Sequence, residues 1–155
     1  MGKKAILLPC LAIAFDAIRL FFLPQYAAAL FKHRRVRSVD HPVDSSIPFL
    51  HETAPLYLSF IALWMNVVFH TERAYGKRSH AQLAGFLRYV QNLYRDASKV
   101  YLHTHTTTKR PARSPNLQCA LIRVMDPHLN CIPSLHVTLV LGAWDKAKSV
   151  YKALG

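Results

Sequence analysis

Hydrophobic residues fall into long runs separated by short polar segments. Ala5–Phe31 is the first apolar run, and Ala54–Phe69 is the second and the cleanest. A helix needs about 20 apolar residues to cross a bilayer, so the first run is long enough and the second needs its flanking residues. Between Ala81 and Tyr101, apolar residues instead recur every three to four positions, which indicates an amphipathic helix. The pattern predicts an all-α protein with membrane-associated helices.

The first apolar run contains two charges, Asp16 and Arg19. Residues three apart lie on one face of a helix, so we expect these side chains to pair. Charges in membrane segments usually face protein rather than lipid. A signal peptide is the competing interpretation, because Lys3 and Lys4 precede an apolar stretch at Ala5–Phe15. No convincing cleavage site follows, so the sequence favours a retained anchor.

The amphipathic stretch Ala81–Tyr101 departs from a lipid-exposed span, because Arg88, Arg95 and Lys99 lie largely off its apolar stripe. Two interpretations stay open: a solvated helix packed on a core, or a helix on a membrane surface. The composition of Ser38–Ser46 and Leu102–Asn116 predicts loops. Leu117–Met125 is a short apolar piece, and the basic segment Ala143–Gly155 is helix-prone.

Length and charge narrow the choice of partner. The 155 residues fit one domain, 1–155, in which 52% hydrophobic content accompanies a net charge of +12. A basic excess favours an anionic surface, and both nucleic acid and anionic lipid qualify. The cationic run at residues 32–37 directly follows an apolar segment, which favours a cytoplasmic juxtamembrane cluster. We therefore expect anionic membrane lipid as a partner and no nucleic acid.

The three cysteines, Cys10, Cys119 and Cys131, cannot form a complete set of disulfides. A zinc site would need Cys119 and Cys131 together with some of the histidines His103, His105, His128 and His136. Their spacing matches no compact zinc-ligand pattern, so we predict no metal and no cofactor.

The segment Asp126–Gly142 carries the strongest chemical signal. Pro133 fits the first turn of a following helix, and Val137–Ala143 indicates a buried or membrane-embedded helix. Ser134 and His136 then lie at a helix start, where unpaired N–H groups and the helix dipole attract anions. An anionic partner there could protonate His136, which could return the proton to a leaving group.

Cys131–Val137 also resembles the second signature of the type-2 phosphatidic acid phosphatase superfamily. Its Pro-Ser-Leu-His form is typical of the branch that includes inositol-phosphorylceramide-synthase-like enzymes. The resemblance implies that Ser134 binds the substrate phosphate and that His136 protonates the departing alcohol. A second, more C-terminal histidine is the nucleophile in the family. An ordinary proline-initiated helix with a capping serine remains the alternative.

Two further stretches resemble motifs of the same family, and they occur along the chain in the family's order. Asp44–Phe49 resembles the acidic-to-Ile-Pro-Phe stretch that precedes a membrane helix in this branch. Arg110-Pro111 fits the end of the first signature, which is a lysine, six intervening residues and then Arg-Pro, although the lysine position falls on His103. The resemblance therefore implies phosphate binding by Arg110, with Lys109 as a substitute only if it reaches the phosphate from another angle.

The third signature, which supplies the nucleophilic histidine, is missing. Only 19 residues follow His136, and none is histidine. The resemblance thus implies a partial, C-terminally truncated helical bundle in the cell or inner membrane, crossing it more than once. We expect a lipid-phosphate phosphatase-like or phosphotransferase-like protein that acts on phosphate esters in intact relatives but is inactive on its own. The alternatives are a non-enzymatic membrane protein that keeps phosphate binding and a basic nucleic-acid-binding protein.

The helix start at Ser134 and the family resemblance lead to one expectation about the geometry of the site. The candidate acid is His136, and the candidate phosphate ligands are Arg110, Ser134 and Lys109. We expect Arg110, Ser134 and His136 to meet in one polar pocket.

Overall fold

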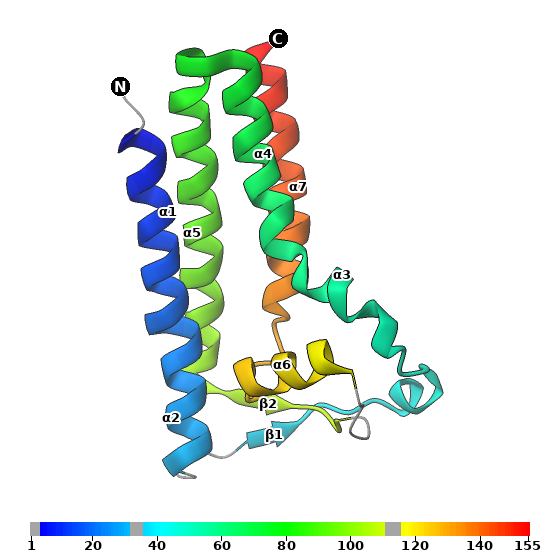
Figure 1. Ribbon diagram of the computed structural model, residues 1–155. Helices are drawn as coiled ribbons and strands as arrows, with labels where there is room; N and C mark the ends of the chain where they lie inside the picture. The colour runs from blue at the N-terminus through cyan, green and yellow to red at the C-terminus, as the bar shows by residue number, and fades with distance from the viewer. Residues whose placement is uncertain (1–3, 32–35, 111–115) are drawn as a thin grey trace.

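The computed structural model describes residues 4–31, 36–110 and 116–155, which form a bundle of long helices above a small polar end (Figure 1). The first rod consists of α1 (Lys4–Asp16), a π-helical stretch η1 (Ala17–Phe22) and α2 (Leu23–Phe31). The other long helices are α4 (Phe60–Tyr75), α5 (His80–His103) and α7 (Leu135–Leu154). α1 packs on α5, α5 on α7 and α7 on α4. The predicted all-α class is confirmed at this coarse level.

Helix α5 is the centre of the bundle. Leu83, Phe86, Leu87 and Val90 are completely buried on its apolar stripe. The glycine at position 142 of α7 lets that helix approach closely, since a Cβ there would lie 2.6 Å from Leu93 Cδ1. α1 and α7 cover the stripe, so the apolar face of residues 81–101 packs in the core of the bundle. Whether the rest of this helix meets water or lipid stays a prediction.

Asp16 is a buried charge that joins α1 to α5. Its side chain is only 3% exposed, and Oδ2 accepts hydrogen bonds from Arg95 Nε and Gln91 Nε2, both at 2.8 Å. Arg19 Nη2 lies farther away, 3.5 Å from Oδ1. The predicted Asp16–Arg19 pair is confirmed, but the closer partners come from the neighbouring helix.

The polar end of the bundle contains structure that the sequence analysis assigned to loops. β1 (Val36–Ser38) pairs in parallel with β2 (His105–Thr107), with Val36 opposite His105. Hydrogen bonds from Thr106 N to Leu129 O and from Cys131 N to Thr106 O attach the segment before α7. The loop predictions for Ser38–Ser46 and Leu102–Asn116 are therefore wrong in part, because Ser38 and His105–Thr107 belong to strands that pair across distant segments. Residues 111–115 of the second prediction lie outside the described residues.

Short helices complete this end (Figure 1). They are η2 (Pro42–Ser46), η3 (His51–Thr53), α3 (Ala54–Leu58) and α6 (Leu117–Met125), while η4 (Gly76–Ser79) turns the chain at the opposite end. Pro111 and residues 32–35 of the cationic run lie outside the described residues.

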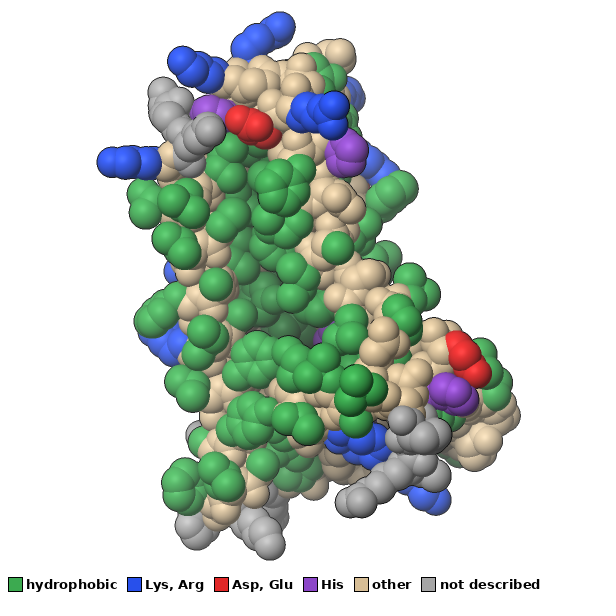
Figure 2. All heavy atoms as spheres, in the orientation of Figure 1, with side chains coloured by type: hydrophobic (Ala, Val, Ile, Leu, Met, Phe, Trp, Pro, Cys, Tyr) green, Lys and Arg blue, Asp and Glu red, His purple; other side chains and the backbone are tan. Residues whose placement is uncertain are grey.

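Much of the bundle surface is apolar. Ile6–Phe31 and His51–His103 each contain a helical window long and apolar enough to cross a membrane, judged by length and composition. Figure 2 shows hydrophobic side chains gathered over α1, α4 and α6, with a hollow between them and Lys and Arg side chains toward the two ends. The chain exposes 10414 Å², against about 7,900 Å² expected for a compact monomer of its mass. The chain thus exposes more surface than a compact monomer of its mass, and many large apolar side chains are among the exposed residues.

Candidate functional site

Helix α7 begins at the segment with the strongest sequence signal. Ser134 is its N-cap, where Ser134 Oγ accepts a hydrogen bond from Val137 N at 3.4 Å. Ser134 O also accepts from the backbone and hydroxyl of Thr138. Pro133 therefore lies just ahead of the helix rather than in its first turn, and the Tyr101 hydroxyl donates to its carbonyl. The Ser134 hydroxyl serves the capping role that the sequence analysis gave as the alternative.

His136 lies in the first turn of α7, packed between two aromatic rings. Its ring stacks on Tyr57 with centroids 3.9 Å apart, and it meets Phe60 edge-on at 4.3 Å. Burial lowers the pKa of His136, and the negative charge of Asp126 opposes this shift. Burial therefore disfavours the protonated imidazole, which is the form that a general acid needs.

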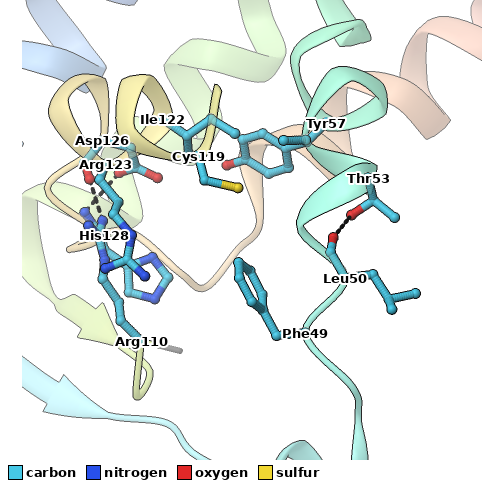
Figure 3. A pocket seen from close by; sticks show the side chains of 11 residues that line it. Phe49, Leu50, Thr53, Tyr57, Arg110, Cys119, Ile122, Arg123, Asp126 and His128 are labelled. Atoms are coloured by element: carbon cyan, nitrogen blue, oxygen red, sulfur yellow. Dashed lines mark hydrogen bonds between the residues drawn. The ribbon is translucent and has the colours of Figure 1, made fainter. Parts of the chain in front are cut away.

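A first cavity of about 230 Å³ lies beside α6, between this helix and the segment that leads into α3 (Figure 3). Arg110, Arg123 and His128 form a basic wall, and Phe49 and Leu50 line the opposite side. The remaining lining residues are Thr53, Ala54, Tyr57, Cys119, Ile122 and Asp126. The cavity thus combines cationic and apolar surface.

Hydrogen bonds to Asp126 fix the basic wall. Arg110 Nη2 donates to the Asp126 carbonyl, and His128 N donates to Asp126 Oδ1 at 2.8 Å. His128 Nε2 also lies 2.7 Å from Thr108 Oγ1. Burial lowers the pKa of His128, and the nearby positive charge of Arg110 adds to the effect. The positive charge of the cavity at pH 7 therefore comes from Arg110 and Arg123.

A second cavity of about 160 Å³ adjoins the first and is almost entirely apolar. It shares Tyr57, Ile122 and Asp126 with the first cavity, and His136 lines it. Its other walls come from η1, α3, α4, α5, α6 and the start of α7: Ala17, Phe21, Phe22, Leu58, Phe60, Ile61, Tyr94, Met125 and Leu135. The two cavities are therefore neighbours with different linings, one basic on one side and the other apolar.

The predicted site residues are only partly brought together. Arg110 and His136 line adjoining cavities, whereas Ser134 and Lys109 line neither. Lys109 is exposed, and its backbone N–H donates to Asp40 Oδ1 at 2.6 Å. This hydrogen bond, together with one from the Ser38 hydroxyl, lowers the pKa of the Asp40 carboxyl. Phosphate binding by Ser134 or Lys109 would need a different placement of these side chains and stays a prediction.

The sequence analysis gave no site role to Arg123 and His128 of the basic wall, to Asp126, which holds that wall, or to Tyr57, which lies between the cavities. Arg123, Asp126 and His128 crowd into the six residues that end α6 and begin the turn, and such a polar cluster before an apolar helix was an available signal. Tyr57 gave no signal, because its stacking on His136 depends on the contact between α3 and α7.

The histidines and cysteines at this end have other partners. His105 Nδ1 lies 3.1 Å from Asn130 Oδ1 in a buried pair. Cys119 Sγ donates to His51 O, and Cys131 Sγ donates to His128 O. Among the described residues, no group of three His, Cys, Asp or Glu side chains is placed to hold a metal ion.

Comparisons of the chain with protein-family models, curated proteins and solved structures found no match in any of the three. The resemblance to the phosphatidic acid phosphatases therefore rests on the sequence motifs alone and stays a prediction.

Proposed function

We propose that this chain is a membrane protein that binds a lipid phosphate and does not turn it over on its own. The proposal is supported by the two adjoining cavities. Arg110, Arg123 and His128 line one side of the first, and the second is lined almost wholly by apolar groups. A phosphate ester of a lipid has the same two parts. Its phosphate suits the basic end of the site, and its hydrocarbon suits the apolar end.

Arginine is suited to this role, because its planar guanidinium presents several N–H donors to phosphate oxygens. Arg110 uses one nitrogen to hold the Asp126 carbonyl, which fixes the guanidinium and leaves other N–H groups for a ligand. Neutral His128 adds a ring that can accept or donate a hydrogen bond. The resemblance of Arg110-Pro111 to the family's first phosphate-binding signature supports the same assignment.

Binding without turnover follows from the state of His136. An acid for the leaving alcohol needs a proton, yet this ring is stacked on Tyr57, and burial holds its pKa low. One imidazole cannot attack phosphorus and also protonate the oxygen on the opposite side, because in-line displacement separates the two. The site therefore fits the non-enzymatic alternative better than a phosphatase.

The proposal includes a membrane location, in which Ile6–Phe31 and the apolar part of the stretch His51–His103 cross the bilayer. Extraction separates this location from the nucleic-acid-binding alternative. A protein held by nucleic acid or by surface charge leaves the membrane fraction in high salt, whereas a spanning protein stays in the membrane through alkaline carbonate.

Titration of the detergent-solubilised chain with phosphatidate, and with diacylglycerol as the neutral counterpart, tests the proposed ligand. We expect Arg110→Gln to weaken phosphatidate binding about 10- to 100-fold, the effect of losing a charge-assisted hydrogen bond. Lys109→Gln is the matched control, since Lys109 is adjacent in sequence but lines neither cavity. Equal losses in both variants, or equal affinity for diacylglycerol, would overturn the proposal. Phosphate release that disappears in His136→Ala would overturn the absence of turnover.

A further inference from the structure

The polarity of α6 is inverted relative to that of a surface helix in water. Leu117, Leu121 and Val124 share its outer face, because residues three and four apart are neighbours on a helix, and they are 83%, 48% and 71% exposed. Arg123, the sole charged residue of α6, lies on the inner side and lines the basic cavity. A surface helix in water normally turns its charges outward and its leucines inward. The outer face of α6 therefore suits an apolar environment.

The outer face of α6 belongs to a larger apolar surface. Figure 2 shows its hydrophobic side chains gathered in one patch with those of α1 and α4. Met125 is exposed at the edge of the face and also lines the apolar cavity. Gln118, an exposed polar residue, lies at the same edge, about 100° around the helix from Leu117. A surface of this extent with so few polar groups fits a bilayer better than a single protein partner, whose interface would carry a polar rim.

Hydrogen bonds to α2 fix the depth of α6. The Tyr26 hydroxyl donates to Val124 O, and Gln25 Oε1 accepts from Leu129 N shortly after α6 ends. Tyr26 belongs to the apolar stretch Ile6–Phe31, and a rise of 1.5 Å per residue places it about 8 Å inside Phe31. Figure 1 shows α6 lying across the long helices rather than along them. If the stretch spans the bilayer, as the proposed function holds, α6 lies in the plane of the membrane near the edge of the hydrocarbon.

We infer that the outer face of α6 is embedded in the bilayer, with Leu117, Leu121 and Val124 in contact with lipid hydrocarbon. Helices that lie in the membrane plane bury their apolar face about 5–10 Å into the boundary between headgroups and acyl chains, which agrees with the depth of Tyr26. In this position α6 separates hydrocarbon on its outer side from the basic cavity on its inner side, where Arg123 lies. The inference rests on the membrane location in the proposed function.

Spin labels on single cysteines, in phosphatidylcholine vesicles, distinguish lipid, water and protein around α6. Oxygen concentrates in hydrocarbon and a nickel chelate in water, so their collision rates with the label report its surroundings. In a chain whose three natural cysteines are replaced by alanine, we expect oxygen collisions to exceed nickel collisions several-fold at Val124→Cys. Leu11→Cys is the lipid control, because Leu11 is exposed on α1 and lies five residues inside Ile6, as Tyr26 lies five inside Phe31. Lys77→Cys, on the exposed turn η4 at the opposite end, is the water control and should give the reverse order.

The two controls separate this inference from the proposed function. Nickel access at Val124→Cys with oxygen access at Leu11→Cys would overturn the inference alone, because the first rod would be in lipid and α6 in water. Low access of both reagents at Val124→Cys would also overturn it, because protein would then cover the face. Nickel access at Leu11→Cys would overturn the membrane location as well.

Photochemical cross-linking provides a second measurement in the chain with its natural cysteines. A benzophenone side chain at position 124, in vesicles that contain a tagged phospholipid, should become attached to that lipid on illumination. The same side chain at position 77 should give several-fold less lipid adduct. Equal adducts at the two positions, or attachment at position 124 to protein alone, would contradict the inference.

Discussion

Replacing Asp16 with alanine gives the sharpest test of how the bundle is held together. The Asp16 carboxylate is only 3% exposed, and it is the described acid that joins α1 to α5 through Arg95 and Gln91. Its removal leaves Arg95 without its partner, but the Arg95 side chain is 49% exposed and is not enclosed by the bundle. The loss is therefore smaller than that for a pair in which both partners are buried.

The magnitude follows from the two hydrogen bonds of 2.8 Å that the carboxylate accepts. A hydrogen bond to a charged group contributes about 1.5–3 kcal/mol, and recovery of the carboxylate's desolvation cost offsets part of the sum. We expect Asp16→Ala to lower the free energy of unfolding by about 2–3 kcal/mol. Arg19→Ala should cost less than about 1 kcal/mol, because Arg19 is 56% exposed and 3.5 Å from the carboxylate.

Unfolding of the purified chain in mixed micelles, followed by circular dichroism, measures both values. Double-mutant cycles then separate the two pairs. The Asp16–Arg95 coupling energy should exceed about 1 kcal/mol, and the Asp16–Arg19 coupling energy should stay below about 0.5 kcal/mol. Equal coupling energies would mean that the contact between helices contributes no more than the contact within one helix, and the reasoning would be refuted.

Two further predictions concern α7. Burial keeps His136 neutral in the folded chain, so the unfolded chain takes up a proton first as the pH falls below about 6.5, and stability declines there. His136→Phe should make the melting temperature less sensitive to acid. An unchanged pH dependence would assign the effect to His128 instead, because burial lowers the pKa of that histidine too. Gly142→Leu should destabilise the bundle by about 1–3 kcal/mol through overpacking against Leu93, whereas Gly142→Ala should be nearly neutral. Chemical unfolding of the two variants checks this order, and equal stability would exclude close packing at Gly142.

The sequence predicted the helices whose hydrophobic pattern is local. The apolar run at residues 5–31 and the periodic stretch at residues 81–101 both became helices, because their patterns repeat within a few turns. The ion pair between Asp16 and Arg19 followed from spacing on one helix. Its stronger partner, Arg95, lies 79 residues away, and no local pattern connects the two.

The pairing of β1 with β2 was missed for a similar reason. Each strand contributes three residues, too few for a period-two pattern to stand out, and the residues near β2 are a threonine run that indicates a loop. At the candidate site, the motif predicted a helix start at Ser134 correctly and the environment of His136 incorrectly. The aromatic rings that lower its pKa come from α3 and α4, far away in the sequence.

The two ends of the proposed lipid site depend on different parts of the chain. The basic cavity takes its walls from residues 49–57, from Arg110 and from residues 119–128, and α1 and η1 contribute none of its described lining. The apolar cavity needs Ala17, Phe21 and Phe22 of η1, which begins directly after Asp16. Asp16 holds α1 and η1 against α5. The contact between η1 and the neighbouring helices therefore forms part of the apolar cavity and no part of the basic cavity. Phosphate recognition in the proposed site therefore belongs to the polar end of the bundle, and recognition of the hydrocarbon belongs to the contact between its first rod and the helices around it.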